Sequence, residues 1–73
     1  MLHFESLIRQ IKNRREELQI TQEQLADIAE VGVRTLKAFE SGKGNPTLQT
    51  VNALANALGL ELCFQIKQIS TNE

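Results

Sequence analysis

Apolar residues along this 73-residue chain recur first at helical spacing and then, near its end, at every second position. In residues 4–18 the apolar positions follow a mixed three- and four-residue spacing, which places them on one face of a predicted helix; they are Phe4, Leu7, Ile8, Ile11 and Leu18. A second helix is predicted to begin after Thr21 and to end near Glu30, because Thr21 and Gln24 have the spacing of a capping box. Its apolar stripe is expected to consist of Leu25, Ile28 and Ala29.

Two further helices are predicted in the middle of the chain. Leu36 and Phe39 stand three apart and indicate a short helix at about 33–40, preceded by Gly32 as a turn residue or modest N-cap. Residues 41–46 are rich in Gly, Ser, Asn and Pro and are expected to form a loop. Thr47 then caps a fourth helix that ends at Gly59, with a predicted buried side of Leu48, Val51, Leu54, Ala55 and Leu58.

The spacing changes at Leu60, where apolar and polar residues begin to alternate, which predicts a β-strand over 60–69. A lone strand cannot make its own ladder hydrogen bonds, and no second strand is predicted in the chain. We therefore expect it to pair, antiparallel, with the same strand of a second copy, forming a homodimer. The expected interface residues are Leu60, Leu62, Phe64 and Ile66.

Length and composition agree with a small protein that depends on a second copy for stability. A chain of 73 residues forms one domain with a thin core. Cys63 is the only cysteine and His3 the only histidine, so neither an internal disulfide nor a Cys/His zinc site is possible. We expect no metal and no cofactor, which leaves dimerisation as the remaining source of stability.

The absence of a long apolar run and of a leader pattern favours a cytoplasmic protein without a membrane partner. The net charge of −1 counts against a generally basic, nucleic-acid-binding chain. However, residues 33–45 carry Arg34, Lys37 and Lys43 against Glu40 alone, so a nearly neutral protein can present one basic face. Such a protein is expected to bind non-specific DNA weakly and to need dimerisation for affinity.

The arrangement over 21–40 points to DNA. Two short helices separated by a three- to four-residue turn, with polar residues at the start of the second, form a helix-turn-helix motif. In that motif the second helix enters the major groove. An enzyme is not expected, and neither is a small-molecule substrate, because the chain lacks paired carboxylates and a phosphate-binding glycine loop after a strand.

Several segments resemble the Xre/Cro-type helix-turn-helix family over about residues 5–60; they are Thr21–Ala26, Phe39–Lys43, Asn45–Leu48 and Leu54–Ala55. The resemblance implies a mainly α, four- to five-helix, lambda-repressor-like DNA-binding domain over 1–60. The dimerisation strand would then occupy 61–69 and a polar tail 70–73. The implied partner is double-stranded operator DNA.

The resemblance also assigns roles to individual residues. Gln22, at the start of the second helix, would meet a phosphate together with backbone amides. Val33, Arg34 and Lys37 would face base edges, with Arg34 as the candidate for bidentate contact with guanine. For Thr35 two roles stay open: a contact with a phosphate, and packing within the protein.

The loop and the first helix receive roles from the same resemblance. Lys43 and Asn45, which follow the third helix, would contact backbone phosphates. Arg15 and Glu40 match positions that form a partly buried ion pair in phage-type repressors, and this pair would be structural.

The chain departs from the family pattern in the turn, where Glu30-Val31-Gly32 replaces Gly-Val followed by a Ser, Thr or Asn cap. A shifted turn would change which side chains of the third helix face the bases. Ala38 also stands at a position that often carries a base-contacting side chain, so the direct contacts are expected to be few.

Residues 58–68, with Leu60-Glu61-Leu62 after Gly59, are similar to the C-terminal segment of HipB-type antitoxins. This second resemblance implies an antitoxin that represses its own operon and binds a HipA-type kinase toxin. Two alternatives stay open: an Xre-family regulator unrelated to toxin–antitoxin systems, and a helical protein-interaction module without DNA binding. The acidic residues Glu23, Asp27 and Glu30 are expected to be solvated, with a toxin-binding surface as the alternative.

Overall fold

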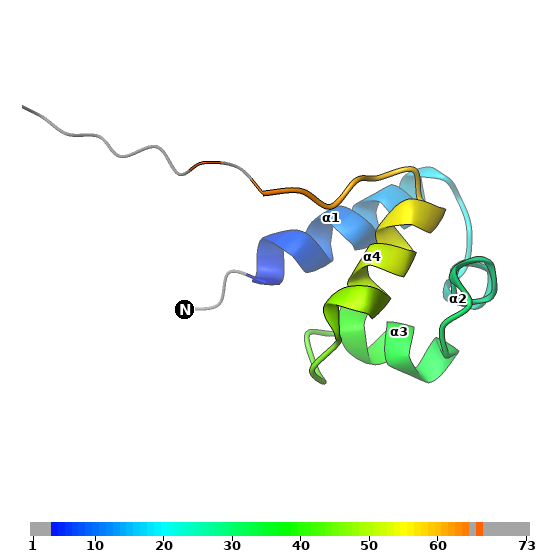
Figure 1. Ribbon diagram of the computed structural model, residues 1–73. Helices are drawn as coiled ribbons and strands as arrows, with labels where there is room; N and C mark the ends of the chain where they lie inside the picture. The colour runs from blue at the N-terminus through cyan, green and yellow to red at the C-terminus, as the bar shows by residue number, and fades with distance from the viewer. Residues whose placement is uncertain (1–3, 65, 67–73) are drawn as a thin grey trace, which may run out of the picture.

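The computed structural model describes residues 4–64 and residue 66. Over these residues the chain forms four helices: α1 (Phe4–Glu17), α2 (Gln22–Ala29), α3 (Val33–Glu40) and α4 (Leu48–Ala57) (Figure 1). The predictions of a mainly helical fold and of its four helices are confirmed, with bounds close to those expected from capping residues and apolar spacing.

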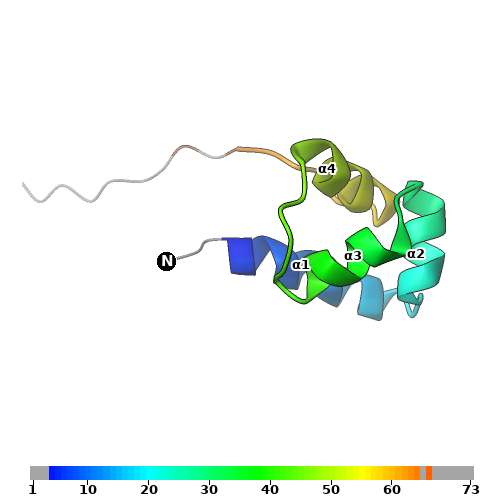
Figure 2. The same cartoon turned by 90° about the horizontal axis from the view of Figure 1, so that it is seen from below.

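The helices pack so that α3 is held from two sides and keeps one side open. Contacts join α2 with α3, α2 with α4, and α1 with α3. Figure 1 shows α2 end-on and α3 from the side, and Figure 2 shows the same steep crossing from below. This crossing of two short helices over a brief turn is the geometry of a helix-turn-helix motif.

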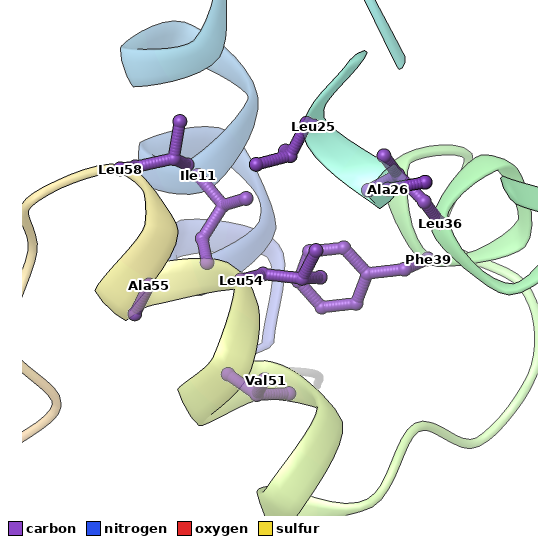
Figure 3. Packing of buried hydrophobic residues seen from close by; sticks show 9 residues of the cluster. All are labelled: Ile11, Leu25, Ala26, Leu36, Phe39, Val51, Leu54, Ala55 and Leu58. Atoms are coloured by element: carbon purple, nitrogen blue, oxygen red, sulfur yellow. The ribbon is translucent and has the colours of Figure 1, made fainter. Parts of the chain in front are cut away.

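All four helices contribute to one core (Figure 3). Its nine buried residues are Ile11, Leu25, Ala26, Leu36, Phe39, Val51, Leu54, Ala55 and Leu58. Four residues predicted on apolar faces are exposed: Phe4, Leu18, Ile28 and Leu48. Leu18 follows the last residue of α1, and Leu48 is the first residue of α4 and lies beyond the core. In α2 the buried side includes Leu25 and Ala26 in place of Ile28, which is 58% exposed.

Each helix is closed by the same backbone pattern. Two or three residues past each helix, a backbone N–H donates to the carbonyl oxygen five positions earlier, and the residue just before that donor has a positive φ, which is the Schellman arrangement. The four bonds are Ile20 to Arg15 (3.3 Å), Val31 to Ala26 (2.9 Å), Lys43 to Ala38 (2.8 Å) and Leu60 to Ala55 (2.8 Å). The left-handed residues are Gln19, Glu30, Gly42 and Gly59.

This pattern defines the turn between α2 and α3. Glu30 takes the left-handed conformation, with φ of 61°, that ends α2, and Gly32 has extended backbone and N-caps α3. The departure from the family sequence therefore leaves α3 beginning at Val33, as expected. The departure has a cost in free energy, because Glu30 bears a side chain and occupies a left-handed conformation that glycine adopts freely.

Replacing Glu30 with glycine is expected to raise the free energy of unfolding by about 1 kcal/mol, because glycine removes the Cβ strain of the left-handed conformation. In a domain of this size the melting temperature would rise by about 4–8 °C. Thermal unfolding followed by circular dichroism measures the change. The matched control is Glu16→Gly within α1, which is expected to lower stability by a similar amount. An unchanged or lower melting temperature for Glu30→Gly would contradict this account of the turn.

The predicted strand lies at the edge of what the structure describes. Residues 60–64 and 66 are in neither helix nor strand; Leu60 and Leu62 pack against the core, whereas Phe64 and Ile66 are exposed. Residues 65 and 67–69 of the predicted strand, and the predicted tail at 70–73, lie outside the described residues. A strand that pairs only with a second copy has no partner in one chain, so the strand and the dimer stay predictions.

Candidate nucleic-acid interface

The open side of α3 carries the candidate DNA-contacting residues. Leu36 and Phe39 are buried, and the 3.6-residue period of the helix then turns Arg34 to the opposite side, with Lys37 and Ala38 on either side of it. Arg34 is exposed and Ala38 is partly exposed. Arg34 therefore forms the centre of the outward face of α3, and its contact with base edges stays a prediction.

The loop between α3 and α4 borders this face on one side. Thr35 and Ala38 line a shallow depression of about 250 Å³ together with the loop residues Lys43, Gly44, Asn45 and Pro46. The structure therefore brings together three of the predicted DNA-contacting residues: Thr35, Lys43 and Asn45. The depression therefore lies between α3 and the loop that follows it.

Lys37 lies on the other border of the face, toward α2. Its Nζ is 3.6 Å from Oε2 of Glu23, and both side chains are largely exposed. An exposed pair of this kind is worth about 0–1 kcal/mol, so it can separate when a nucleic acid approaches. Lys37 is thus further from the centre of the face than Arg34, and Val33 lies at the first residue of α3, partly exposed.

The start of α2 is fixed by the predicted capping box. The Oγ1 of Thr21 accepts a hydrogen bond from the Gln24 backbone N–H at 3.0 Å, and the Gln24 Oε1 accepts one from the Thr21 N–H at 2.8 Å. Gln22 follows as the first residue of α2, and its Nε2 donates to Oε1 of Glu40 at 3.0 Å. A carboxamide nitrogen carries two N–H groups, so Gln22 can bind Glu40 and a phosphate at once.

Arg15 and Glu40 form the ion pair that the resemblance implies. The Arg15 Nε donates to Oε2 of Glu40 at 2.8 Å and a terminal nitrogen donates to Oε1 at 3.0 Å, which makes the pair bidentate. The Glu40 side chain is only 4% exposed and that of Arg15 12%. The hydrogen bond to Glu40 holds the pKa of Arg15 above its usual range. The positive charge of Arg15 therefore stabilises the folded state fully at any pH below the ordinary pKa of arginine. This stabilisation is lost only as the pH rises through the raised pKa of the folded state.

Three helices meet at this ion pair. Arg15 of α1 donates to Glu40 of α3 and also to the backbone oxygen of Ile20, the latter at 2.8 Å. Gln22 of α2 donates to the same Glu40. Among the described residues, no buried side-chain nitrogen or oxygen lacks a hydrogen-bond partner. The bond between Gln22 and Glu40 was not foreseen, because sequence spacing gives no sign of a contact across 18 positions. It ties the first turn of α2 to the last turn of α3, which fixes their crossing.

Unpaired positive charge marks the same surface. In residues 4–64 and 66, four basic side chains have no carboxylate oxygen within 4.0 Å: Arg9, Lys12, Arg34 and Lys43. Two of them, Arg34 and Lys43, belong to α3 and to the loop beside it. Arg14, by contrast, pairs with Glu17 at 3.4 Å and donates to the Leu58 carbonyl oxygen at 2.9 Å, joining α1 to the end of α4.

Other chemistry has little support in the described part of the chain. Those residues contain no group of three His, Cys, Asp or Glu side chains that could hold a metal ion. Cys63 is exposed. No helix there is long and apolar enough to span a membrane.

Comparisons with known proteins agree with this geometry. A profile of the helix-turn-helix family HTH_3 matches residues 11–65. The chain is also similar to an uncharacterised HTH-type transcriptional regulator of Methanothermobacter thermautotrophicus strain Delta H, with 41% identity over 51 residues that cover 70% of this chain and 74% of that protein. No solved structure matches the chain.

Proposed function

Because the chain belongs to the helix-turn-helix family, we propose that this DNA-binding transcriptional regulator is a repressor that binds an operator as a homodimer. The observation that carries the proposal is the outward face of α3. It holds an exposed Arg34 without a carboxylate within 4.0 Å among the described residues, and Thr35 and Ala38 of the same helix line a depression with Lys43 and Asn45 of the loop. A helix with this face fits the major groove, which is about 12 Å wide.

The residues of the face divide into two kinds of contact. Arg34 donates two hydrogen bonds to O6 and N7 of a guanine, and the methyl groups of Val33 or Ala38 suit a thymine methyl. Gln22, Lys43 and Asn45 hold the phosphates on either side and set the orientation of α3 without reading sequence. Thr35 is a further phosphate-contacting residue, on the side of the loop. Lys37 contacts the DNA only after its ion pair with Glu23 separates. The direct sequence contacts are therefore few.

Because one chain makes few direct contacts with the bases, binding of two chains to one operator is favoured. Two-fold symmetry places the recognition helices about 34 Å apart, so the operator would be a palindrome with half-sites one helical turn apart. The support for a dimer is the alternation of apolar residues after Gly59, two of which, Phe64 and Ile66, are almost fully exposed in one chain. Sedimentation equilibrium at micromolar concentration is expected to give a dimer, and a monomer would contradict this part of the proposal.

A mobility-shift titration tests the function directly. The protein is mixed at low salt with DNA from upstream of its own coding sequence and, in parallel, with a scrambled fragment of equal length and composition. The upstream fragment is expected to bind at least about 10³-fold more tightly, as specific sites usually do. Equal affinity for both fragments, or no shift with either, would overturn the proposal.

Lys43→Ala is expected to weaken binding to every DNA sequence by a similar factor, because Lys43 contacts phosphate and not bases. The slope of log affinity against log salt concentration should become less steep by about one. Titrations at four salt concentrations measure this slope. Lys12→Ala, which removes an equally unpaired lysine from α1, serves as the control and should leave the slope unchanged. A change of base preference in Lys43→Ala would contradict the phosphate assignment.

We also propose a HipB-like role: an antitoxin that represses its own operon and binds a HipA-type kinase toxin. Its support is the segment after Gly59, whose sequence resembles those antitoxins. The acidic side chains of Glu23, Asp27 and Glu30 are exposed on and after α2 and would form the toxin-facing surface.

Co-expression with the product of the adjacent gene tests the antitoxin role. If that product is a kinase toxin, this chain should restore growth and co-purify with it, and Asp27→Lys should weaken the complex. Growth arrest that persists, or an adjacent product unrelated to kinases, would favour a regulator outside toxin–antitoxin systems. Toxin binding without any DNA shift would instead support an interaction module.

A further inference from the structure

An apolar groove opens at the end of the molecule where α1 begins. It has a volume of about 610 Å³ and lies between the start of α1, the loop after α3 and the start of α4. Its apolar lining is formed by Phe4, Leu7, Ile8, Phe39, Leu48 and Val51. Phe4 and Leu48 are each 66% exposed, although large apolar side chains of this kind are usually covered. Residues 4–64 and 66 therefore leave the groove open.

The segment after α4 supplies apolar side chains that also lack cover. Leu60 and Leu62 pack against the core, and Phe64 and Ile66 continue the same alternation but are each 94% exposed. In an extended chain, residues two apart project to the same side. Figures 1 and 2 both show this segment, in orange, leaving the helices on the side where α1 begins. Among the described residues, the side chains of Phe64 and Ile66 are therefore left without cover.

We propose that the groove binds Phe64 and Ile66 of a second copy of this chain, and that the exchange is mutual. The groove and the segment lie at the same end of the molecule, so a two-fold axis there brings each segment to the groove of the other copy. The inference rests on the dimer of the proposed function and names the surface that the dimer uses. It is compatible with the two segments running antiparallel beside each other at the axis.

The size of the surfaces is sufficient for a specific dimer. A buried aromatic side chain covers roughly 150–250 Å². Two segments with two large side chains each, together with the matching groove walls, bury on the order of 1,000 Å² or more, which reaches the lower end of specific interfaces.

Docking would also act on the DNA-binding face. The groove wall includes Lys43, Gly44, Asn45 and Pro46, the same loop that borders α3. Filling the groove supports this loop from behind and reduces the freedom of the residues that hold phosphate. Dimer formation and DNA binding are therefore coupled through the loop as well as through the two-fold axis.

Cross-linking between two different variants tests the exchange. One variant carries Leu48→Cys and the other Phe64→Cys, each with Cys63→Ser, so each chain has a single cysteine. Mixed and oxidised with copper–phenanthroline, they are expected to form a disulfide that links the two different chains, identified by mass spectrometry of the joined peptides. An Ile28→Cys variant replaces the Leu48 variant as the control; Ile28 is exposed on α2 and lines no part of the groove, so it should give no such link.

A third variant with both Leu48→Cys and Phe64→Cys in one chain distinguishes the alternatives. A linked dimer supports exchange, whereas an internally linked monomer shows the segment in its own groove and overturns it. Absence of any disulfide also overturns it. Leu48→Ser should raise the dimer dissociation constant at least about tenfold, against less than about twofold for Ile28→Ser. The upstream-DNA titration, run on the wild-type chain, separates a failure of docking from a failure of the proposed function.

Discussion

Arg15→Met is expected to lower the free energy of unfolding by about 3–5 kcal/mol, because it leaves the carboxylate of Glu40 buried without its cation. A chain of this length has a total stability of about 4–11 kcal/mol, so the change removes a large share of it. The Ile20 carbonyl oxygen also loses its hydrogen-bond donor, and the ion pair that joins α1 to α3 is lost. Urea unfolding followed by circular dichroism measures the loss.

Two further variants show whether the loss comes from the unpaired charge. Arg15→Met combined with Glu40→Leu should recover a good part of the stability, because no buried charge is then left alone. Glu17→Ala removes the exposed partner of Arg14 and should change stability by less than about 1 kcal/mol. If Arg15→Met were no more harmful than Glu17→Ala, the buried pair could not be the element that positions α3.

Arg34→Ala is expected to reduce affinity for the operator by about 1–3 kcal/mol, or roughly 5- to 150-fold, and to abolish the preference at one base pair of each half-site. The physical reason is the loss of two parallel hydrogen bonds to guanine. Titration of a set of operators, each with one base pair changed, measures both effects.

Arg34→Lys provides the matched control, because lysine keeps the charge but cannot make the bidentate contact. It should retain most of the salt-dependent affinity while losing the preference at the same base pair. A uniform loss of affinity across all operators for Arg34→Ala would show that Arg34 contacts phosphate and that another residue reads the sequence.

The helices were predictable because the residues that begin and end them act locally. Thr21 with Gln24 and Gly59 after α4 have the predicted roles, and the apolar spacing of Leu54, Ala55 and Leu58 marks their buried side. These signals depend on neighbours within a few positions, so a sequence carries them without knowledge of the fold.

Features that depend on packing between helices were harder to predict from the sequence. Ile28 and Leu48 have the spacing of buried residues, yet both are exposed, and in α2 the neighbouring helices cover Ala26 instead of Ile28. The bond of Gln22 to Glu40 joins residues 18 positions apart and becomes visible only when α2 and α3 are placed. Glu30 shows a related limit, since a residue that bears a side chain gives no sign of a left-handed turn.

The layout of the candidate site was not predictable from the sequence, and the DNA contacts of its residues stay predictions. Residues Thr35, Lys43 and Asn45 were each assigned DNA contacts by resemblance, and the structure groups them around one depression. Lys37 was also assigned to the bases; its Nζ lies 3.6 Å from Oε2 of Glu23 on α2, and its contact with bases stays a prediction. The central position of Arg34 follows from the buried positions of Leu36 and Phe39 on the same helix.

The central claim, that the outward face of α3 and its borders bind DNA, is tested most directly by amide chemical-shift changes on titration with upstream DNA. The account predicts the largest changes at Val33–Ala38, at Gln22 and at Lys43–Asn45. The amides of α1 at Arg9 and Lys12 should change little. Changes centred on α1, or spread evenly over the surface, would contradict it.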